Sequence, residues 1–157
     1  MQPQGTDPST GFLDRGSCLE LAGRLAFSAT ASGQSLAALW IDLSRLKQVN
    51  ESFGHIGGDL VIAQIAGRLR EKSAGRGEWC RMGGDEFVCL IPHCDADHAR
   101  RLAQDLLQAI EAPLRFGELF LHPSASIGIA SLGADEDPFV FLERAGRAMG
   151  PCFRRDD

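Results

Sequence analysis

Residues 78–91 read EWCRMGGDEFVCLI, and this stretch decides the fold class of the chain. Its two ends, 78–82 and 87–91, have the aromatic and β-branched composition of strands, and Pro92 ends the second one. The four residues between them, Gly83 to Glu86, are typical of a hairpin turn. Two strands joined in this way are antiparallel neighbours, which breaks the strand–helix–strand alternation of a parallel sheet. The stretch therefore favours an α+β fold.

The remaining elements follow from apolar spacing and from the positions of glycine and proline. Strands are predicted over 36–41, 113–116 and 119–130, and helices over 18–29, 95–110 and 138–149. Between the first strand and the hairpin we expect two helices, a short one over 46–53 stopped by Gly54 and a longer one opening at 57–59. The order predicts one domain over 7–157 with a mixed, largely antiparallel sheet flanked by helices. The polar residues 1–6 are expected to form a loose N-terminus.

Composition and charge exclude several classes of protein. The chain has 157 residues, and its 44% apolar and 24% charged content is that of an ordinary globular domain. Sixteen basic and 21 acidic residues give a net charge of −5, which argues against a general nucleic-acid binder. The longest apolar run, 36–41, is far shorter than the ~20 residues that span a bilayer. We therefore expect no nucleic acid and no membrane span in this segment.

The cysteines indicate a reducing compartment. There are five, an odd number, and no two have the C-x-x-C spacing. Residues 1–5 contain neither a basic nor an apolar signal-peptide region. These features predict a cytoplasmic location, with the thiols acting as small buried hydrophobes.

Two acidic sites are candidates for chemistry. Asp42 follows the apolar strand 36–41, and Asp85 and Glu86 lie at the tip of the hairpin. Each site alone has a simple structural interpretation. Asp42 could cap a helix, a role for which Ser44 competes, and 83–86 could be a surface turn. If the strands are neighbours, however, the carboxylates converge at one sheet edge and can hold Mg²⁺.

The motifs also carry a resemblance to a known family. Residues 81–87, RMGGDEF, match the signature of the GGDEF family of diguanylate cyclases. Four further segments match in the same order. They are 7–15, which resembles D-x-L-T-G-L-x-N-R; 42–51, which resembles D-x-D-x-F-K-x-I-N-D; 54–59, which resembles G-H-x-x-G-D; and 126–130, which resembles S-x-G-I-A. The similarity extends from Asp7 to about Met149.

The resemblance implies both fold and activity. Members have a ferredoxin-like, nucleotidyl-cyclase-like core and join two GTP molecules into cyclic di-GMP. Two domains meet head-on as a homodimer, each with one GTP, so that each 3′-hydroxyl attacks the other α-phosphate. A sensor domain usually accompanies the module in a longer parent chain. The resemblance therefore implies GTP, cyclic di-GMP and a second copy of the chain as partners.

Roles for individual residues follow from the same resemblance. The Asp42 and Asp85 carboxylates and the Leu43 carbonyl would hold Mg²⁺ or Mn²⁺, which aligns an in-line attack. Asn50 and Asp59 would bind the guanine edge and reject adenine, because an unmatched polar group is costly. Beside Asp85, Glu86 is the catalytic candidate for deprotonating the 3′-hydroxyl. The phosphates would face Lys47 and the neighbouring Ser44, Arg45, Leu46, Gly83 and Gly84.

Departures from the family pattern leave alternatives open. Ser44 stands where the second Asp of D-x-D is expected, and Leu46 replaces an aromatic residue. In the degenerate C-terminal helix, Phe153 and Asp157 replace a phosphate-binding Lys and an Arg. A weak or inactive domain that binds GTP or cyclic di-GMP as a sensor is therefore the alternative to a working cyclase. Asn50 and the Asp59 carboxylate argue against a third interpretation, a structural module that binds no nucleotide.

The family's product-inhibition motif, R-x-x-D, is missing. Its Arg and Asp would fall at positions 74 and 77, which are Ala74 and Gly77. We therefore expect no inhibitory site for cyclic di-GMP there. Product is expected to enter the substrate site instead and to compete with GTP.

Overall fold

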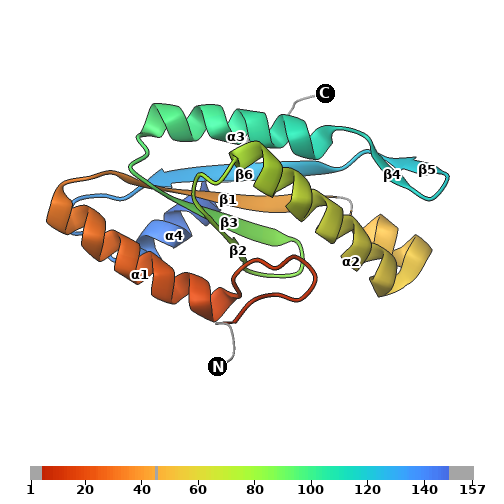
Figure 1. The fold of residues 1–157 in the computed structure, drawn as a ribbon, viewed down its shortest axis with the longest axis horizontal. Coiled ribbons are helices and arrows are strands. Elements are labelled where there is room, and N and C mark those ends of the chain that lie inside the picture. The colour runs from red at the N-terminus through yellow and green to blue at the C-terminus, as the bar shows by residue number, and fades with distance from the viewer. Residues whose placement is uncertain (1–4, 45, 149–157) are drawn as a thin grey trace.

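The computed structural model describes residues 5–44 and 46–148 (Figure 1). Within these residues the helices are α1 (Arg15–Ser32), α2 (Leu46–Ser73), α3 (Ala96–Glu111) and α4 (Pro138–Arg147). The strands are β1 (Leu36–Ser44), β2 (Glu78–Arg81), β3 (Glu86–Pro92), β4 (Leu114–Phe116), β5 (Leu119–Leu121) and β6 (Ser124–Ser131). Three helices start at an aspartate whose side chain accepts a backbone N–H of the first turn. These caps are Asp14, Asp95 and Asp137.

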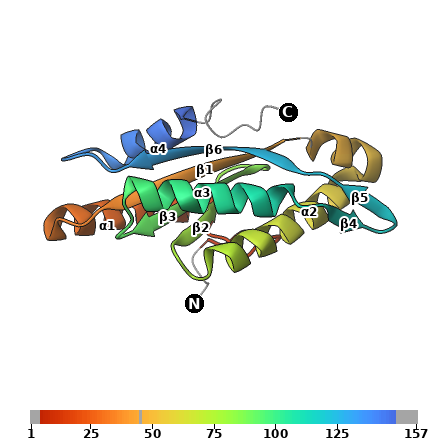
Figure 2. The same cartoon turned by 90° about the horizontal axis from the view of Figure 1, so that it is seen from above.

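The central sheet has the strand order β2-β3-β1-β6, and each neighbouring pair is antiparallel. Helices α2 and α3 cover one face of this sheet, and α1 and α4 cover the other (Figures 1 and 2). Strands β4 and β5 form a separate hairpin at one end of the molecule. The predicted α+β domain with a largely antiparallel sheet is confirmed.

Strand β1 lies inside the sheet because its side chains are apolar on both faces. Leu39 and Ile41 pack with residues of α2 and α3, whereas Leu36 and Ala38 pack with residues of α1 and α4. All four are at most 1% exposed. Alternation of side chains along a strand therefore gives the domain one core on each face of the sheet.

Two predicted strand boundaries were wrong. The strand predicted over 36–41, with Asp42 directly after it, continues to Ser44, because residues 42–44 still pair with β6. Asp42 is therefore inside a strand and does not cap a helix. The strand predicted over 119–130 is two strands, β5 and β6, which belong to different sheets. Pro123 lies between them, and a proline cannot donate to a strand ladder.

The two helices predicted around Gly54 are present as the two halves of α2. Gly54 has non-helical angles, φ 72° and ψ −178°, and the helix kinks there. A φ in this region favours glycine, because the Cβ of any other residue would clash with neighbouring backbone atoms. The second half begins directly after Gly54, earlier than predicted, so Asp59 is inside this half rather than at its start.

Two further expectations concern the membrane and the cysteines. Among the described residues, none of the helices combines the length and the apolar character needed to cross a bilayer. Cys18, Cys80, Cys89 and Cys94 are buried free thiols, as predicted. Burial raises the pKa of the Cys89 thiol and so disfavours its reactive thiolate. The fifth, Cys152, is outside the described residues.

The N-terminus begins to pair before Asp7. Thr6 forms a bridge with Leu13, and the Gly5 carbonyl accepts the Asp14 N–H at 2.6 Å. Leu13 in turn pairs with Cys80 of β2. Residues 5–14 therefore fold back beside the edge of the sheet, next to the β2–β3 hairpin (Figure 1).

Candidate functional site

Strand β1 and the tip of the β2–β3 hairpin bring three carboxylates together. Asp42 is paired opposite Glu86, and Asp85 precedes Glu86 at the tip. One oxygen from each of these three carboxylates lies within 4.8 Å of the others. All three side chains are half-buried. The two acidic sites of the sequence therefore lie at one place in the fold.

The electrostatics of this cluster favour a bound cation. Partial burial raises the pKa of the Asp42 carboxyl, and the negative charges of Asp85 and Glu86 raise it further. Clustered carboxylate oxygens are ligands of the kind that Mg²⁺ takes, and a cation would relieve their repulsion. The donor set of this chain therefore fits a hard divalent metal.

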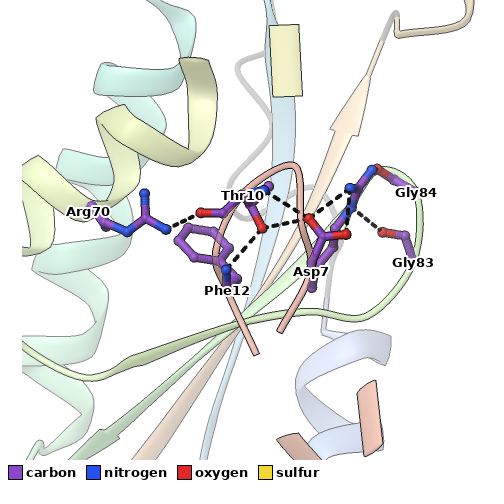
Figure 3. A network of polar contacts seen from close by, with 7 residues as sticks. Asp7, Thr10, Phe12, Arg70, Gly83 and Gly84 are labelled. Atoms are coloured by element: carbon purple, nitrogen blue, oxygen red, sulfur yellow. Dashed lines mark hydrogen bonds and ion pairs between the residues drawn. The ribbon is translucent and has the colours of Figure 1, made fainter. Parts of the chain in front are cut away.

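Arg81, the last residue of β2, holds the glycine turn in place (Figure 3). Its Nε donates to the Gly83 carbonyl at 3.2 Å, and its Nη2 donates to the Gly84 carbonyl at 2.8 Å. Its Nη1 lies 3.0 and 3.1 Å from the two carboxylate oxygens of Asp7. The Arg81 and Asp7 side chains are only 13% and 19% exposed. One largely buried guanidinium thus ties the turn to the N-terminal segment.

Asp7 is in turn fixed by its own neighbours (Figure 3). It accepts hydrogen bonds from the Thr10 N–H at 3.0 Å and the Thr10 hydroxyl at 2.8 Å. Burial raises the pKa of the Asp7 carboxyl, but the bonds from Thr10 and Arg81 outweigh it and hold that pKa below its usual range. Arg70 of α2 donates to the Thr10 carbonyl and lies 4.8 Å from the centre of the Phe12 ring. The network therefore extends from the glycine turn to α2.

The turn is also held from the side of β1. The Leu43 N–H donates to the Asp85 carbonyl at 2.9 Å, and the Met82 N–H donates to the Glu86 carbonyl at 2.8 Å. Backbone bonds and one guanidinium thus position the tip on both sides. The backbone that carries Asp85 and Glu86 is therefore held by hydrogen bonds from β1, from Arg81 and within the hairpin.

A cavity of about 380 Å³ lies between this tip and α2. Six of the residues predicted from the sequence to contact metal or nucleotide line it. They are Leu46, Lys47, Asn50, Asp59, Gly84 and Asp85. The sequence analysis gave no role to His55, Gly58, Ile62 and Arg81, which line it too. The volume is of the size that holds a small-molecule ligand.

Asn50 and Asp59 come from opposite sides of the kink in α2. Asn50 belongs to the first half and Asp59 to the second. A Cβ added at Gly58 would stand 1.8 Å from the Asn50 Oδ1, so this glycine makes room for the Asn50 amide. The kink and Gly58 together place an amide and a carboxylate on one wall of the cavity.

The cavity does not enclose every predicted residue. The Lys47 side chain is 88% exposed and lies 4.0 Å from the Glu51 carboxylate. Ser44 and Leu43 line a second, more apolar groove rather than the cavity. Arg45, Phe153 and Asp157 are outside the described residues, and so is the end of the predicted last helix at Met149.

The positions of the product-inhibition motif have an unusual backbone. Ala74 and Gly77 both have positive φ, 52° and 83°. A Cβ added at Gly77 would lie 2.8 Å from the Leu90 carbonyl oxygen and 2.8 Å from the Cys89 Sγ. A side chain at position 77 of this chain would therefore strain the backbone and force neighbouring atoms to shift, beyond the absence of an aspartate in the sequence.

Comparisons with known proteins identify the family of this chain. The family model described as diguanylate cyclase, GGDEF domain matches residues 4–151. Diguanylate cyclase DgcP of Pseudomonas aeruginosa is 33% identical over 145 residues, which are 92% of this chain and 22% of that protein. Response regulator PleD of Caulobacter vibrioides is 32% identical over 148 residues, 92% of this chain and 33% of that protein. The chain thus spans about a fifth to a third of the length of these relatives.

Solved structures show the same fold. The GGDEF domain of TpbB from Pseudomonas aeruginosa has a TM-score of 0.85 and 32% identity, covering 92% of this chain and 86% of that one. Diguanylate cyclase SiaD from the same organism, solved with its activator SiaC, has a TM-score of 0.86 and 28% identity, covering 92% and 56%. With a family match over residues 4–151 and relatives above 30% identity over 92% of its length, the chain belongs to the GGDEF domain family.

Proposed function

We propose that this chain is a diguanylate cyclase domain, which condenses two GTP molecules into cyclic di-GMP and releases pyrophosphate. The observation that carries the proposal is the cavity lined by Asn50 and Asp59 on one side and by Asp85 on the other. The cluster of three carboxylates includes Asp85. A nucleotide bound there has its base and its phosphates beside groups of matching chemistry.

The acidic cluster would bind the phosphates through a metal ion. The Asp42 and Asp85 carboxylates and the Leu43 carbonyl would hold Mg²⁺, which when bound neutralises triphosphate charge and orients the α-phosphate. The backbone of the Gly83–Gly84 turn carries no side chain that would keep a phosphate away. Lys47 is the nearest described cation on α2, and its exposed ammonium can turn toward the γ-phosphate.

The helical wall selects the base. The Asp59 carboxylate accepts from guanine N1–H and N2–H₂, and the Asn50 amide pairs with the guanine O6 edge. Adenine presents the opposite donor and acceptor pattern, so both groups would lose their partners. The wall therefore favours GTP over ATP.

Glu86 supports the chemical step. Its carboxylate would accept the proton of the 3′-hydroxyl as that oxygen attacks the α-phosphate of the second GTP. One domain holds one GTP, so the reaction needs a second copy of the chain that faces the first. The homodimer is therefore part of the proposal, as is a sensor domain in a longer parent protein.

A second candidate function is nucleotide binding without turnover. The observation that favours it is Ser44, which removes one carboxylate next to the acidic cluster. A site with fewer anionic ligands would hold a divalent metal more weakly. Such a domain would bind GTP or cyclic di-GMP and act as a sensor.

One experiment separates the two functions. The purified chain is incubated with GTP and Mg²⁺, and cyclic di-GMP and pyrophosphate are measured by chromatography. A working cyclase forms both at a rate that rises more steeply than linearly with protein concentration, because two copies must meet. A sensor binds GTP in calorimetry and leaves it unchanged. Equal affinity for GTP and ATP would contradict both.

A further inference from the structure

The β4–β5 hairpin lies beside the first half of α2, at the same end of the molecule (Figure 2). Its base is anchored in the core, because Leu114 of β4 is fully buried. Phe116, two residues further on, packs partly against the same core. The base of the hairpin is therefore fixed in the core, and an aromatic side chain lies near its tip.

Phe116 meets α2 at the kink. The Phe116 and Phe53 ring centres are 4.8 Å apart, with 56° between the ring planes. Phe53 is the last residue before Gly54, where the helix changes direction. An aromatic pair at this distance contributes stabilisation beyond the apolar area that it buries.

The two halves of α2 approach very closely at this pair. A Cβ added at Gly57 would lie 2.4 Å from the Phe53 Cβ and 3.6 Å from the Phe116 Cζ. The Phe53 Cβ is fixed to the backbone, so it could not swing away. Gly57 therefore lets the halves fold together, and the aromatic pair holds Phe53 where they meet.

Elsewhere the hairpin and the first half of α2 are separated by a groove. A cavity of about 370 Å³ lies between them, lined on the helix side by Leu46, Val49 and Phe53 and on the hairpin side by Phe120. Phe120 is 64% exposed. The Phe53–Phe116 contact thus bridges an otherwise loosely filled space.

We infer that the β4–β5 hairpin is part of the guanine-recognition apparatus, with Phe116 as a positioning residue that acts through Phe53. Asn50 lies three residues before Phe53 on the same helical face, and Asp59 lies two residues after Gly57. The angle at the kink therefore sets the separation of the two guanine-binding groups. Phe116 fixes this angle without contacting the nucleotide. The inference rests on the proposed function, because it assumes that these two groups bind guanine.

The test compares base selectivity in matched variants. Dissociation constants for 3′-deoxy-GTP and 3′-deoxy-ATP are measured with Mg²⁺ by calorimetry, since these nucleotides lack the attacking hydroxyl and cannot react. In Phe116→Ala we expect the Kd for 3′-deoxy-GTP to rise about three- to ten-fold, the range given by one aromatic pair. The Kd for 3′-deoxy-ATP should change less than about two-fold, because adenine does not use the paired groups.

Two controls accompany this variant. Phe120→Ala removes an exposed ring from the same hairpin, and Phe116→Tyr keeps the ring at the contact. Both should retain the selectivity of the unmutated chain. Selectivity that is unchanged in Phe116→Ala, or affinity for both nucleotides that falls equally, would overturn the inference.

A second pair of variants applies if Phe116→Ala does not fold. Gly57→Ala places a methyl group against Phe53, whereas Gly67→Ala adds one in the same helix where no other atom lies within 4 Å. We expect reduced selectivity only in Gly57→Ala, and equal selectivity in the two variants would overturn the inference. If the unmutated chain itself does not distinguish the two nucleotides, the proposed guanine site is wrong and this inference falls with it.

Discussion

The two walls of the proposed nucleotide site are built in different ways. The sheet wall carries Asp42 and Glu86 on paired strands and Asp85 in the turn before Glu86, and the Arg81 guanidinium and backbone hydrogen bonds hold this turn. The helical wall carries Asn50 and Asp59 on the two halves of a kinked helix. In the proposed site, strand pairing holds the backbone that carries the metal-ligand candidates, whereas the angle between the helix halves sets the separation of the two candidate base-binding groups. We therefore expect changes in the sheet wall to lower kcat, and changes in the helical wall to alter affinity and base selectivity.

Removal of a sheet-wall carboxylate should have the largest effect. In Asp85→Ala a metal-binding carboxylate is lost, and turnover should fall at least about 100-fold, since a bound metal supplies several kcal/mol of charge stabilisation. The fold should survive because the side chain is only half-buried. Initial rates of cyclic di-GMP formation and thermal unfolding measure the two effects. The exposed Asp105→Ala on α3 is the control, and wild-type turnover in Asp85→Ala would show that the metal assignment is wrong.

Loss of the guanidinium that holds the glycine turn should have the next largest effect. Arg81→Met leaves the Gly83 and Gly84 carbonyls and the Asp7 carboxylate without their partner, at a cost of about 1–3 kcal/mol in unfolding free energy. Because Arg81 also lines the cavity, Asp7→Asn is the informative companion, as Asp7 is not among the lining residues.

Both variants should lower kcat if the turn must be held for catalysis. Amide hydrogen exchange of residues 83–85 should then increase in both. A double variant whose effect equals the sum of the single effects would contradict coupling between Asp7 and Arg81.

Displacement of one helical-wall group should weaken binding without harming the fold. In Gly58→Ala the new Cβ would overlap the Asn50 Oδ1, a side-chain end that can rotate away. We expect a loss of about 1–3 kcal/mol in GTP binding, as for an unmatched polar group, and a similar loss in Asp59→Ala. Alanine is a better helix former than glycine, so unfolding stability should not fall. Calorimetry with 3′-deoxy-GTP measures the binding, and unchanged affinity in Gly58→Ala would remove Asn50 from the guanine site.

The two candidate guanine-binding groups of the helical wall also lead us to expect product inhibition that is competitive with GTP. With Ala74 and Gly77 at the positions of the inhibitory motif, cyclic di-GMP should compete with GTP for Asn50 and Asp59. Steady-state kinetics should show a raised apparent KM for GTP and an unchanged kcat. Inhibition that lowers kcat at constant KM would indicate a separate site. A Gly77→Asp variant should not create such a site, because Ala74 still lacks the guanidinium of the motif and the backbone at position 77 favours glycine.

The smallest expected effect concerns pH and the acidic cluster. The pKa of Asp42 is raised by burial and then by Asp85 and Glu86, so its protonated form favours the folded chain. That stability is fully present below the ordinary value of 3.8 and is lost as the pH rises through the raised pKa. Asp42→Asn should therefore be at least as stable as the unmutated chain at pH 7, and its stability should change less as the pH rises above 3.8.

Mg²⁺ should reproduce part of this stabilisation in the unmutated chain. A cation relieves the repulsion among the three carboxylates, so the Tm at pH 7 should rise with Mg²⁺ concentration. The same addition should raise the Tm of Asp42→Asn by less. An equal rise in both proteins would place the metal elsewhere.

The difference between the walls also explains which parts of the site could be predicted from the sequence. The hairpin and the acidic residues were predicted because strand alternation, the glycine turn and a buried strand are local patterns. Their convergence followed from antiparallel pairing of neighbouring strands. The position of Asp42 two residues before the end of β1 was missed, because a charge after an apolar run is typical of a strand end.

Contacts between distant segments could not be predicted in the same way. Arg81 belongs to the signature stretch, but its partner Asp7 is 74 residues away in the chain. The Phe53–Phe116 pair joins residues sixty-three positions apart in the chain, and the division of β5 from β6 at Pro123 was also missed. Gly54 was predicted to end a helix, yet the angle between the two halves depends on packing that no local pattern contains.

The most direct test of the account is an experimental structure of the chain with 3′-deoxy-GTP and Mg²⁺. We expect metal bound to the Asp42 and Asp85 carboxylates and the Leu43 carbonyl. We also expect the guanine edge to pair with Asn50 and Asp59, with the Asn50-to-Asp59 geometry held by the Phe53–Phe116 contact. Guanine bound in the apolar groove beside Phe120, or metal bound away from Asp42 and Asp85, would contradict the division of the site into a metal-binding sheet wall and a base-binding helical wall.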